Sequence, residues 1–319
     1  MEHPTVTVAQ FYKEHAESLQ MRLLAGEDYL KRIIREPTVN RPGLALSGFT
    51  RYFAYKRVQV MGHAEVFYLR EQRHEERDAR YAYLFAFKIP CFVFSRGLRP
   101  DKEFLAAAEL ARTPVFQTPQ VTMKFINLAT LALESLFAPR GSELGSMVDI
   151  LGVGVIVRGE SGIGKSEAVL ALIERGYSLV ADDVVKVTLV DNREVFCTSA
   201  ELTRDHMEVR GIGIINVAAM FGVKAVRKNK KLDLIITLKA WNEVQDVDRL
   251  GMEREFVKVL GVDIQHITIP VRPGRDIARL IEVAAFQAKL NHSGYNAAEE
   301  LNKRLLAQMA EPVASAPTA

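Results

Sequence analysis

The sequence predicts an α/β protein of two domains: a small N-terminal α/β domain over residues 1–135 and a P-loop-containing C-terminal domain over residues 136–319. Its 319 residues suffice for two domains of ordinary size. Residues 89–119 follow a strand–helix–strand order, which is typical of a small α/β domain. Residues 148–185 then join an apolar strand, a glycine-rich loop, an apolar helix and a second apolar strand.

The N-terminal domain opens with a segment, residues 1–36, whose apolar side chains recur at spacings that a helix places on one face. These side chains are Phe11, Leu19, Leu23, Leu24 and Ile33. We expect two short strands at 57–62 and 65–71. Residues 70–82 mix both charge signs, which is typical of a solvent-facing helix rather than a binding patch.

The second part of this domain has clearer boundaries. Strands are predicted at 89–97 and 113–119, on either side of a helix at 101–112. Asp101 precedes that helix and is suited to cap it. A long apolar helix at 121–137 then leads toward the second domain.

The C-terminal domain begins with a predicted loop at 139–147. Beyond the glycine-rich unit, apolar runs predict strands at 232–241 and 266–271, followed by a helix at 275–290. The last residues, 311–319, have the composition of a frayed tail.

The strongest motif is GESGIGKS at residues 159–166, which fits the G-x-x-x-x-G-K-[ST] pattern between a strand and a helix. Its glycines let the backbone turn tightly and present N–H groups to phosphate oxygens, at the positive end of the following helix. Lys165 can reach the β- and γ-phosphates, and the Ser166 hydroxyl can bind Mg²⁺. The predicted nucleotide-binding residues are Gly159, Glu160, Ser161, Gly162, Ile163, Gly164, Lys165 and Ser166. A glycine-rich turn without a ligand is the less favoured alternative.

Asp182 and Asp183 end the strand that follows this helix. Ligands of open α/β sheets bind at the carboxyl ends of strands, so these acids are expected near the metal and the γ-phosphate. Adjacent strand residues face opposite ways, so one acid can address the site while the other serves a turn. One of them is a candidate general base for a hydroxyl group. Alternatively, both acids end the strand in solvent.

Two later segments combine charge with glycine or proline. Residues 206–217 place Glu208 and Arg210 beside glycines, which indicates either an approach to an anion or metal ion, or a structural β-turn. Residues 269–276 carry two arginines around a Pro-Gly pair and could either bind phosphate or begin a helix.

These motifs together resemble the HPr kinase/phosphorylase family. The matching strings are GESGIGKSE, LVADD, MEVRGIGIINV, DVDRLG and PVRPGR in the second half, and SGFTRYFAYKRVQVMG and FSRGLRPDKEFLAAAE in the first. The resemblance implies a regulatory N-terminal domain and a catalytic domain related to phosphoenolpyruvate carboxykinase. It further implies that ATP and Mg²⁺ are used to phosphorylate a serine of HPr, the phosphocarrier of bacterial sugar uptake. Inorganic phosphate reverses the reaction and releases pyrophosphate, and the family assembles as homohexamers.

The resemblance also assigns roles to residues. Lys165 contacts phosphates, and Ser166 and Glu208 hold Mg²⁺. Asp183 accepts the serine proton and returns it in dephosphorylation, and Arg249 stabilises the transferring group. Asp182 and Arg210 complete the predicted catalytic set. The segment that matters chiefly for dephosphorylation is Pro270, Val271, Arg272, Pro273, Gly274 and Arg275.

One position departs from the family pattern. Ahead of the P-loop strand the family carries a His-Gly pair, and here Leu144 stands where the histidine is expected. Gly145 and Asp149 keep the register. Because leucine neither exchanges a proton nor hydrogen-bonds phosphate, we expect an activity that is weaker or biased toward one direction.

Composition and the absence of certain motifs limit the classes of protein to which the chain can belong. The 42 basic and 39 acidic residues nearly balance, at a net charge of +3, which argues against a broad nucleic-acid surface. Two distant cysteines and the lack of a signal peptide or membrane span point to the cytoplasm. Eukaryotic-type protein kinases are excluded because neither H-R-D-x-x-x-x-N nor D-F-G occurs. The open alternatives are a P-loop kinase of a small metabolite and a nucleotide-binding regulator with reduced catalysis.

Overall fold

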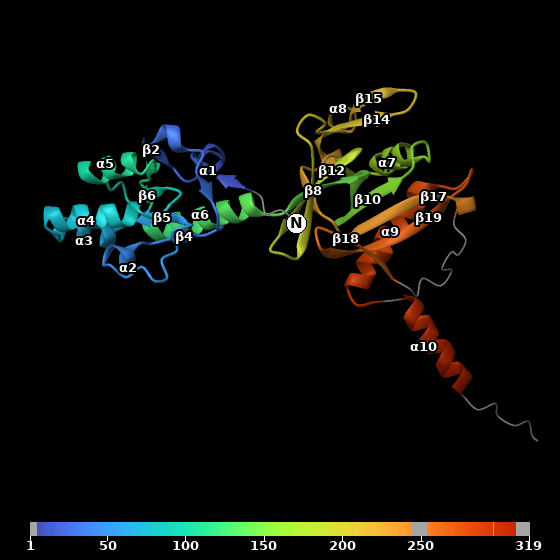
Figure 1. Ribbon diagram of the computed structural model, residues 1–319. Coiled ribbons are helices and arrows are strands. Elements are labelled where there is room, and N and C mark those ends of the chain that lie inside the picture. Colours follow the sequence, from blue (N-terminus) through green and yellow to red (C-terminus); the bar gives the residue numbers. More distant parts are fainter. Residues whose placement is uncertain (1–4, 244–253, 296, 311–319) are drawn as a thin grey trace, which may run out of the picture. The chain divides into compact units, whose positions relative to one another are not determined.

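The computed structural model describes residues 5–243, 254–295 and 297–310. The chain forms two compact units, residues 1–139 and 140–319 (Figure 1). The first unit extends past residue 135 because helix α6 (Thr122–Phe137) is continuous there and buries Leu133 and Leu136 in that unit's core.

The N-terminal unit is built on a five-stranded sheet in the order β2-β7-β6-β5-β4. Strands β4 to β7 are parallel, and β2 pairs antiparallel with β7. The strands are β1 (Val6–Thr7), β2 (Arg22–Ala25), β3 (Ile33–Ile34), β4 (Val39–Asn40), β5 (Val58–Met61), β6 (Phe92–Phe94) and β7 (Val115–Gln117). The helices are α1 (Val8–His15), α2 (Gly43–Leu46), α3 (His63–Glu71), α4 (His74–Phe85), α5 (Lys102–Leu110) and α6.

Helices cover both faces of this sheet, which explains its uninterrupted apolar strands. Phe92 and Phe94 of β6 pack with one cluster, which contains Phe104 of α5, and Val93 between them packs with the other, which contains Phe125 of α6. The strand–helix–strand prediction for residues 89–119 is confirmed. The Asp101 cap is also confirmed, because an oxygen of its carboxylate accepts the Phe104 amide at 2.8 Å.

Two predictions for this unit are wrong. The opening helix is confined to α1, because the chain turns at Gln20 and Gly26, whose φ angles are +51° and +83°. Beyond that turn, Leu23 and Leu24 lie on strand β2. Residues 65–71 belong to helix α3 rather than to a strand, since Glu65 reaches back to accept the Gly62 amide at 2.9 Å and caps the helix.

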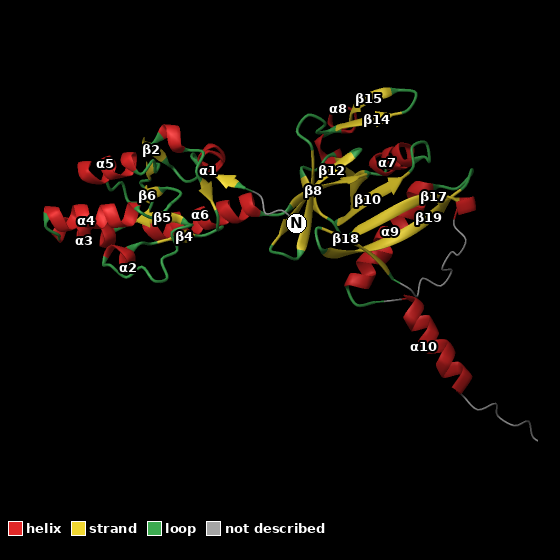
Figure 2. Ribbon diagram, viewed as in Figure 1, coloured by secondary structure: helices red, strands yellow, loops and turns green. Residues whose placement is uncertain are grey.

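The C-terminal unit contains a six-stranded sheet in the order β11-β9-β10-β17-β19-β18 and a four-stranded sheet in the order β16-β13-β12-β8 (Figure 2). Its strands are β8 (Arg140–Leu144), β9 (Ser146–Ile150), β10 (Val153–Gly159), β11 (Ser178–Ala181), β12 (Val184–Val190), β13 (Glu194–Ser199), β14 (His206–Val209), β15 (Gly213–Asn216), β16 (Asn229–Lys231), β17 (Leu234–Ala240), β18 (Glu255–Val259) and β19 (Val262–Val271). Its helices are α7 (Lys165–Glu174), α8 (Val217–Phe221), α9 (Ile277–His292) and α10 (Ala297–Ala310).

The six-stranded sheet is the central layer of this unit. Val155 and Val157 of β10 pack with the apolar residues of α7 and α9, whereas Ile156 packs with Val187 and Cys197 of the four-stranded sheet. Helices therefore cover one face of the sheet and the second sheet covers the other. The strands predicted at 232–241 and 266–271 and the helix predicted at 275–290 are confirmed as β17, β19 and α9.

The loop predicted at 139–147 is wrong. Residues 140–144 form β8, which pairs with β12 from Val184↔Leu144 to Thr188↔Arg140. The sequence of β8 is polar and therefore gives no apolar strand pattern. The strand forms because its backbone pairs with β12, not because its side chains are hydrophobic. The tail at 311–319 lies outside the described residues.

Candidate functional site

The predicted site residues gather at one edge of the six-stranded sheet. Strands β10, β17 and β19 are mutually parallel, and β11 runs the same way because β9 is antiparallel to both β10 and β11. Their carboxyl ends therefore meet at one edge, which we call the carboxyl edge. The P-loop follows β10 there, and Asp182 and Asp183 follow β11.

The P-loop backbone depends on glycine. Gly162 and Gly164 have φ angles of +89° and +97°, in the left-handed region that glycine tolerates best. Gly164 is the N-cap of α7 and offers no side chain to the first amides of that helix. Those N–H groups and the helix dipole thus remain available to an anion.

A small polar cavity of about 140 Å³ lies over this loop. It is lined by Glu160, Ser161, Gly162, Gly164, Lys165, Ser166, Glu167, Asp182, Asp183, Glu208 and Arg210. The structure thus brings together the P-loop, both acids and the Glu208/Arg210 pair, which lie far apart in the sequence. Glu167, the acid after the motif serine, also lines the cavity and was not among the predicted site residues.

The two neighbouring acids differ in their hydrogen bonds. Asp182 accepts from the Ser146 hydroxyl at 2.6 Å with one carboxylate oxygen and from the Glu208 amide at 3.1 Å with the other. The Asp183 carboxylate accepts no hydrogen bond from the residues that the structure describes. Asp182 therefore joins β9 to β14, whereas the Asp183 carboxylate has no such partner in the described parts of the chain. The role of Ser146 has no sequence signal.

Asp183 also has an unusual backbone. Its φ angle is +61°, and its carbonyl accepts the Gly145 amide at 2.9 Å. A left-handed conformation at a non-glycine residue is uncommon and is enriched at functional sites. The turn ends β11 abruptly and places the carboxylate in the cavity lining.

Residues 206–216 form the hairpin β14–β15, which agrees with the structural β-turn considered for segment 206–217. The hairpin also contributes to the cavity. Arg210 lies in its turn and donates a hydrogen bond to the Ser161 hydroxyl of the P-loop. Glu208 lies on β14 with an exposed side chain that lines the cavity.

Other predicted residues lie elsewhere. Leu144 ends β8 opposite Val184, is 75% exposed and does not line the cavity. Residues 270–275 span the end of β19 and the turn before α9, at the same carboxyl edge but outside the cavity lining. Arg249 lies outside the described residues.

The oxygen atoms that line this cavity suit Mg²⁺ as ligands. Magnesium takes oxygen ligands, keeps several waters and is usually bound by one or two protein groups together with substrate phosphates. The Ser166 hydroxyl and the Glu208 carboxylate provide such oxygens within the cavity lining. Within residues 5–243, 254–295 and 297–310 no cluster of three or more His, Cys, Asp or Glu side chains could hold a metal ion.

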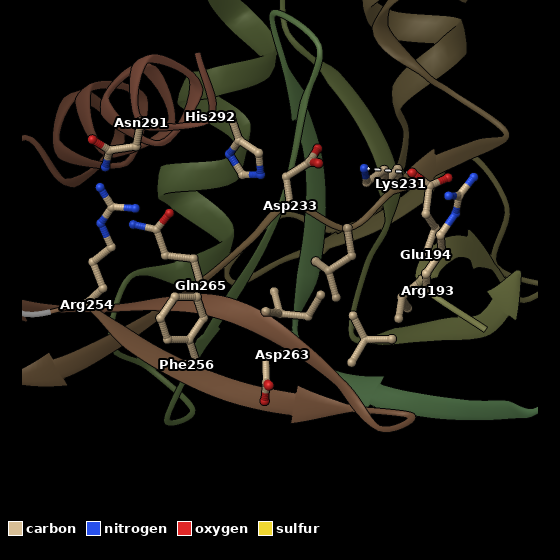
Figure 3. A pocket seen from close by; sticks show the side chains of 14 residues that line it. Arg193, Glu194, Lys231, Asp233, Arg254, Phe256, Asp263, Gln265, Asn291 and His292 are labelled. Atoms are coloured by element: carbon tan, nitrogen blue, oxygen red, sulfur yellow. Dashed lines mark hydrogen bonds and ion pairs between the residues drawn. The ribbon is translucent and has the colours of Figure 1, made fainter. Parts of the chain in front are cut away.

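A larger cavity of about 290 Å³ lies at the opposite, amino edge of the sheet (Figure 3). It is lined by residues that precede β17, by the β18–β19 hairpin and by the last residues of α9. None of the predicted site residues that the structure describes lines it. Its Lys231 is paired with Glu194 at 2.9 Å, and its Asp233 accepts the Gly154 amide at 2.8 Å.

In the part of the chain that the structure describes, no helix combines the length and apolar character needed to span a bilayer.

Comparison with known proteins matches both units to one family. Residues 6–133 match the HPr Serine kinase N terminus, and residues 135–305 match the HPr Serine kinase C-terminal domain. The HPr kinase/phosphorylase of Chloroherpeton thalassium is 41% identical over 96% of this chain and 91% of its own length. That of Caldanaerobacter subterraneus is 40% identical over 92% of this chain and 96% of its own length. The solved Hpr(Ser) kinase/phosphatase of Coxiella burnetii is 31% identical, with a TM-score of 0.47, covering 50% of this chain and 98% of that one.

Proposed function

Because the chain belongs to the HPr kinase/phosphorylase family, we propose that its P-loop cavity transfers the γ-phosphoryl group of ATP to a serine of HPr, and that inorganic phosphate reverses the transfer. The observation that carries this proposal is one cavity lined by the P-loop Lys165 and by Asp183, whose carboxylate has no partner in the described chain.

The forward step needs a base, an electrophile and a leaving group. The serine oxygen attacks the γ-phosphorus while its proton passes to the Asp183 carboxylate. The bond between the γ-phosphorus and the β–γ bridging oxygen breaks, and ADP leaves. Lys165 and the first amides of α7 hold the phosphate oxygens, where developing negative charge is stabilised by fixed donors.

Four further side chains support this arrangement. Ser166 and Glu208 would hold Mg²⁺, which supplies charge neutralisation at the β- and γ-phosphates when bound. Arg210 fixes the P-loop through Ser161 and lies in the same lining, so it can also contact a phosphate. Asp182 orients Ser146 and the Glu208 backbone and is a structural support within the predicted catalytic set.

The reverse step uses the same groups. An oxygen of inorganic phosphate attacks the phosphoserine phosphorus, the serine oxygen leaves with a proton from Asp183, and pyrophosphate forms. We assign phosphate binding to residues 270–275, where Arg272 and Arg275 follow β19 at the carboxyl edge. Arginine suits this task because its planar donor array matches phosphate oxygens.

The assembly state, the cellular location and the role of the N-terminal domain belong to the same proposal. Family membership supports assembly as a homohexamer and action on HPr in the cytoplasm, with the N-terminal domain as the regulatory part. Sedimentation of the full chain would test the assembly state. A P-loop kinase of a small metabolite is not supported, since relatives about 40% identical over more than nine-tenths of the chain are HPr kinase/phosphorylases.

The decisive experiment incubates the full chain with HPr and ATP·Mg²⁺ and records the intact mass of HPr. A mass gain of one phosphoryl group on a serine is expected. Phosphorylated HPr with inorganic phosphate should then lose that group and yield pyrophosphate. ATP binding without either reaction would instead favour the regulator with reduced catalysis, and Lys165→Ala serves as the inactive control.

A further inference from the structure

The sole tryptophan of the chain, Trp241, lies at the carboxyl edge directly after β17. Strands β17 and β19 are parallel neighbours, and their last residues Ala240 and Val271 are register partners. The residues that follow these strands therefore emerge side by side. Trp241 follows one of them and Arg272 follows the other.

The Trp241 ring contacts both Arg272 and Arg275. The Arg272 guanidinium carbon lies 4.8 Å from the centre of the Trp241 ring, and that of Arg275 lies 5.5 Å from it. Both distances fall within the range of cation–π attraction, for which tryptophan is the best aromatic partner. The ring is 45% exposed, so burial alone does not account for its position.

The two arginines have no competing charge partner in the described chain. None of the ion pairs among the described residues involves Arg272 or Arg275. Asp276, the adjacent acid, is engaged elsewhere: it accepts the Arg279 amide at 2.9 Å and pairs with Arg175 at 2.7 Å. That amide first, and Arg175 second, lower the pKa of Asp276, so it stays charged within this separate network.

The turn that carries these arginines leads into α9, whose first residue lies against the P-loop. A Cβ placed on Gly164 would lie 3.4 Å from the terminal methyl of Ile277, directly after the turn. On the other side, Gly159 is the register partner of Leu238 on β17, three residues before Trp241. The tryptophan and its two arginines thus lie in the segments that directly follow β17 and β19, next to the P-loop.

We propose that Trp241 is a positioning residue that holds Arg272 and Arg275 ready to bind inorganic phosphate in the dephosphorylation reaction. This inference rests on the proposed function. The ring face orders two flexible cationic side chains without neutralising them, which a carboxylate partner would do. Two positioned guanidinium groups without a charge partner among the described residues suit the binding of a tetrahedral oxyanion.

The test compares Trp241→Leu with Trp241→Phe in the full chain, measuring the KM for phosphate in dephosphorylation and the KM for ATP in the kinase direction. Loss of the ring should raise the phosphate KM about 5- to 30-fold. Trp241→Phe retains an aromatic face and should stay within about threefold of the wild type. The ATP KM should change less than about twofold in both variants. Phe256→Leu, at an exposed aromatic on the amino edge, is the matched control and should change neither value.

Two readouts do not depend on turnover. Calorimetric titration with inorganic phosphate should show the same weakening in Trp241→Leu. The fluorescence emission of Trp241 should shift in Arg272→Gln and Arg275→Gln but not in Arg254→Gln. If the wild type binds phosphate but performs neither reaction, the proposed function fails while these readouts still decide the role of the ring.

Three outcomes would overturn the inference. Equal phosphate affinity in Trp241→Leu and the wild type would remove the positioning role. An ATP KM that rises as much as the phosphate KM would assign the ring to the nucleotide. A Trp241→Phe variant as weak as Trp241→Leu would show that the aromatic face is not what matters.

Discussion

The two cavities at opposite edges of the six-stranded sheet differ in a way that size does not reveal. The amino-edge cavity has about twice the volume, about 290 Å³ against about 140 Å³. Helix α7 begins at the smaller cavity, whereas α9 ends at the larger one. Because helix starts carry partial positive charge and helix ends partial negative charge, the helix end at the smaller cavity favours an anion and the one at the larger cavity does not.

The side chains reinforce this difference. At the amino edge Lys231 pairs with Glu194, and Asp263 pairs with Lys258 at 3.4 Å. At the carboxyl edge Lys165 and Asp183 line the cavity without a charged partner in the described chain. Charges that neutralise one another stabilise a surface, and charges left without partners are available to a substrate. We therefore predict the effect of substituting the same type of residue at each of the two edges.

The largest difference is expected for the acids. Asp183→Asn should keep the fold and ATP binding but slow phosphoryl transfer about 10²- to 10⁴-fold, because the amide cannot accept the serine proton. The matched substitution Asp263→Asn, at the amino edge, should leave the rate unchanged. Single-turnover phosphorylation of HPr, followed by intact mass, measures both. Normal transfer in Asp183→Asn beside a dead Asp182→Asn would reverse the assignment within the pair.

The lysines should differ by a smaller amount. Lys165→Ala removes a charge-assisted phosphate contact and should weaken ATP binding by about 1.5–3 kcal/mol. Lys231→Ala removes an exposed ion pair with Glu194 and should leave ATP affinity within error. Calorimetric titration with ATP compares the two variants directly. Unchanged ATP affinity in Lys165→Ala would remove the phosphate role of the loop.

Replacing glycine by alanine should also change the free energy of unfolding by different amounts at the two edges. A Cβ on Gly145 would lie 2.6 Å from the Val157 carbonyl oxygen, whereas one on Gly152 would meet no described atom within 4 Å. Both have positive φ, so alanine is strained at either position, but only Gly145 adds a collision with backbone. Gly145→Ala should lower the free energy of unfolding by about 1–3 kcal/mol more than Gly152→Ala does. Urea denaturation measures this, and equal midpoints would contradict the close approach at Gly145.

Sequence patterns predicted the fold where local signals agreed with tertiary packing. The strand, loop and helix around residues 153–174 and helix α9 have apolar periodicity that matches the faces they bury. The predictions failed where contacts with other residues, rather than the local apolar pattern, decide the structure. Strand β8 is polar and is held by β12, and the aromatic run in α3 favours a strand locally but is capped as a helix by Glu65.

The site was predictable to the extent that motifs encode it. The P-loop string could be found without a structure because its chemistry requires those residues in that order. The Asp182-Asp183 pair could be found because it ends the apolar strand after the P-loop helix. The division of labour within the pair could not be predicted, since it depends on Ser146 and on the backbone of Glu208, both distant in sequence. The contact of Trp241 with two arginines likewise arises from the register of β17 and β19.

The smallest expected effect concerns Leu144, where the family pattern has a histidine. Its side chain is 75% exposed, and its register partner Val184 follows Asp183. Leu144→His adds a group that ionises near pH 6.5, so it carries positive charge on the acid side and none above about pH 8.

That charge lies near the carboxyl edge and should attract inorganic phosphate, raising the dephosphorylation rate below about pH 6.5 by two- to fivefold, as for an exposed charge interaction. The kinase direction should change less, because in the proposed mechanism the P-loop holds ATP. Leu151→His is the matched control, since Leu151 is 60% exposed in the turn between β9 and β10 at the amino edge. Rates in both directions from pH 5.5 to 9 compare the three proteins. An additional ionisation in Leu144→His alone would show that position 144 acts on the reaction through its charge, whereas profiles that coincide with the wild type would show that the leucine is functionally silent.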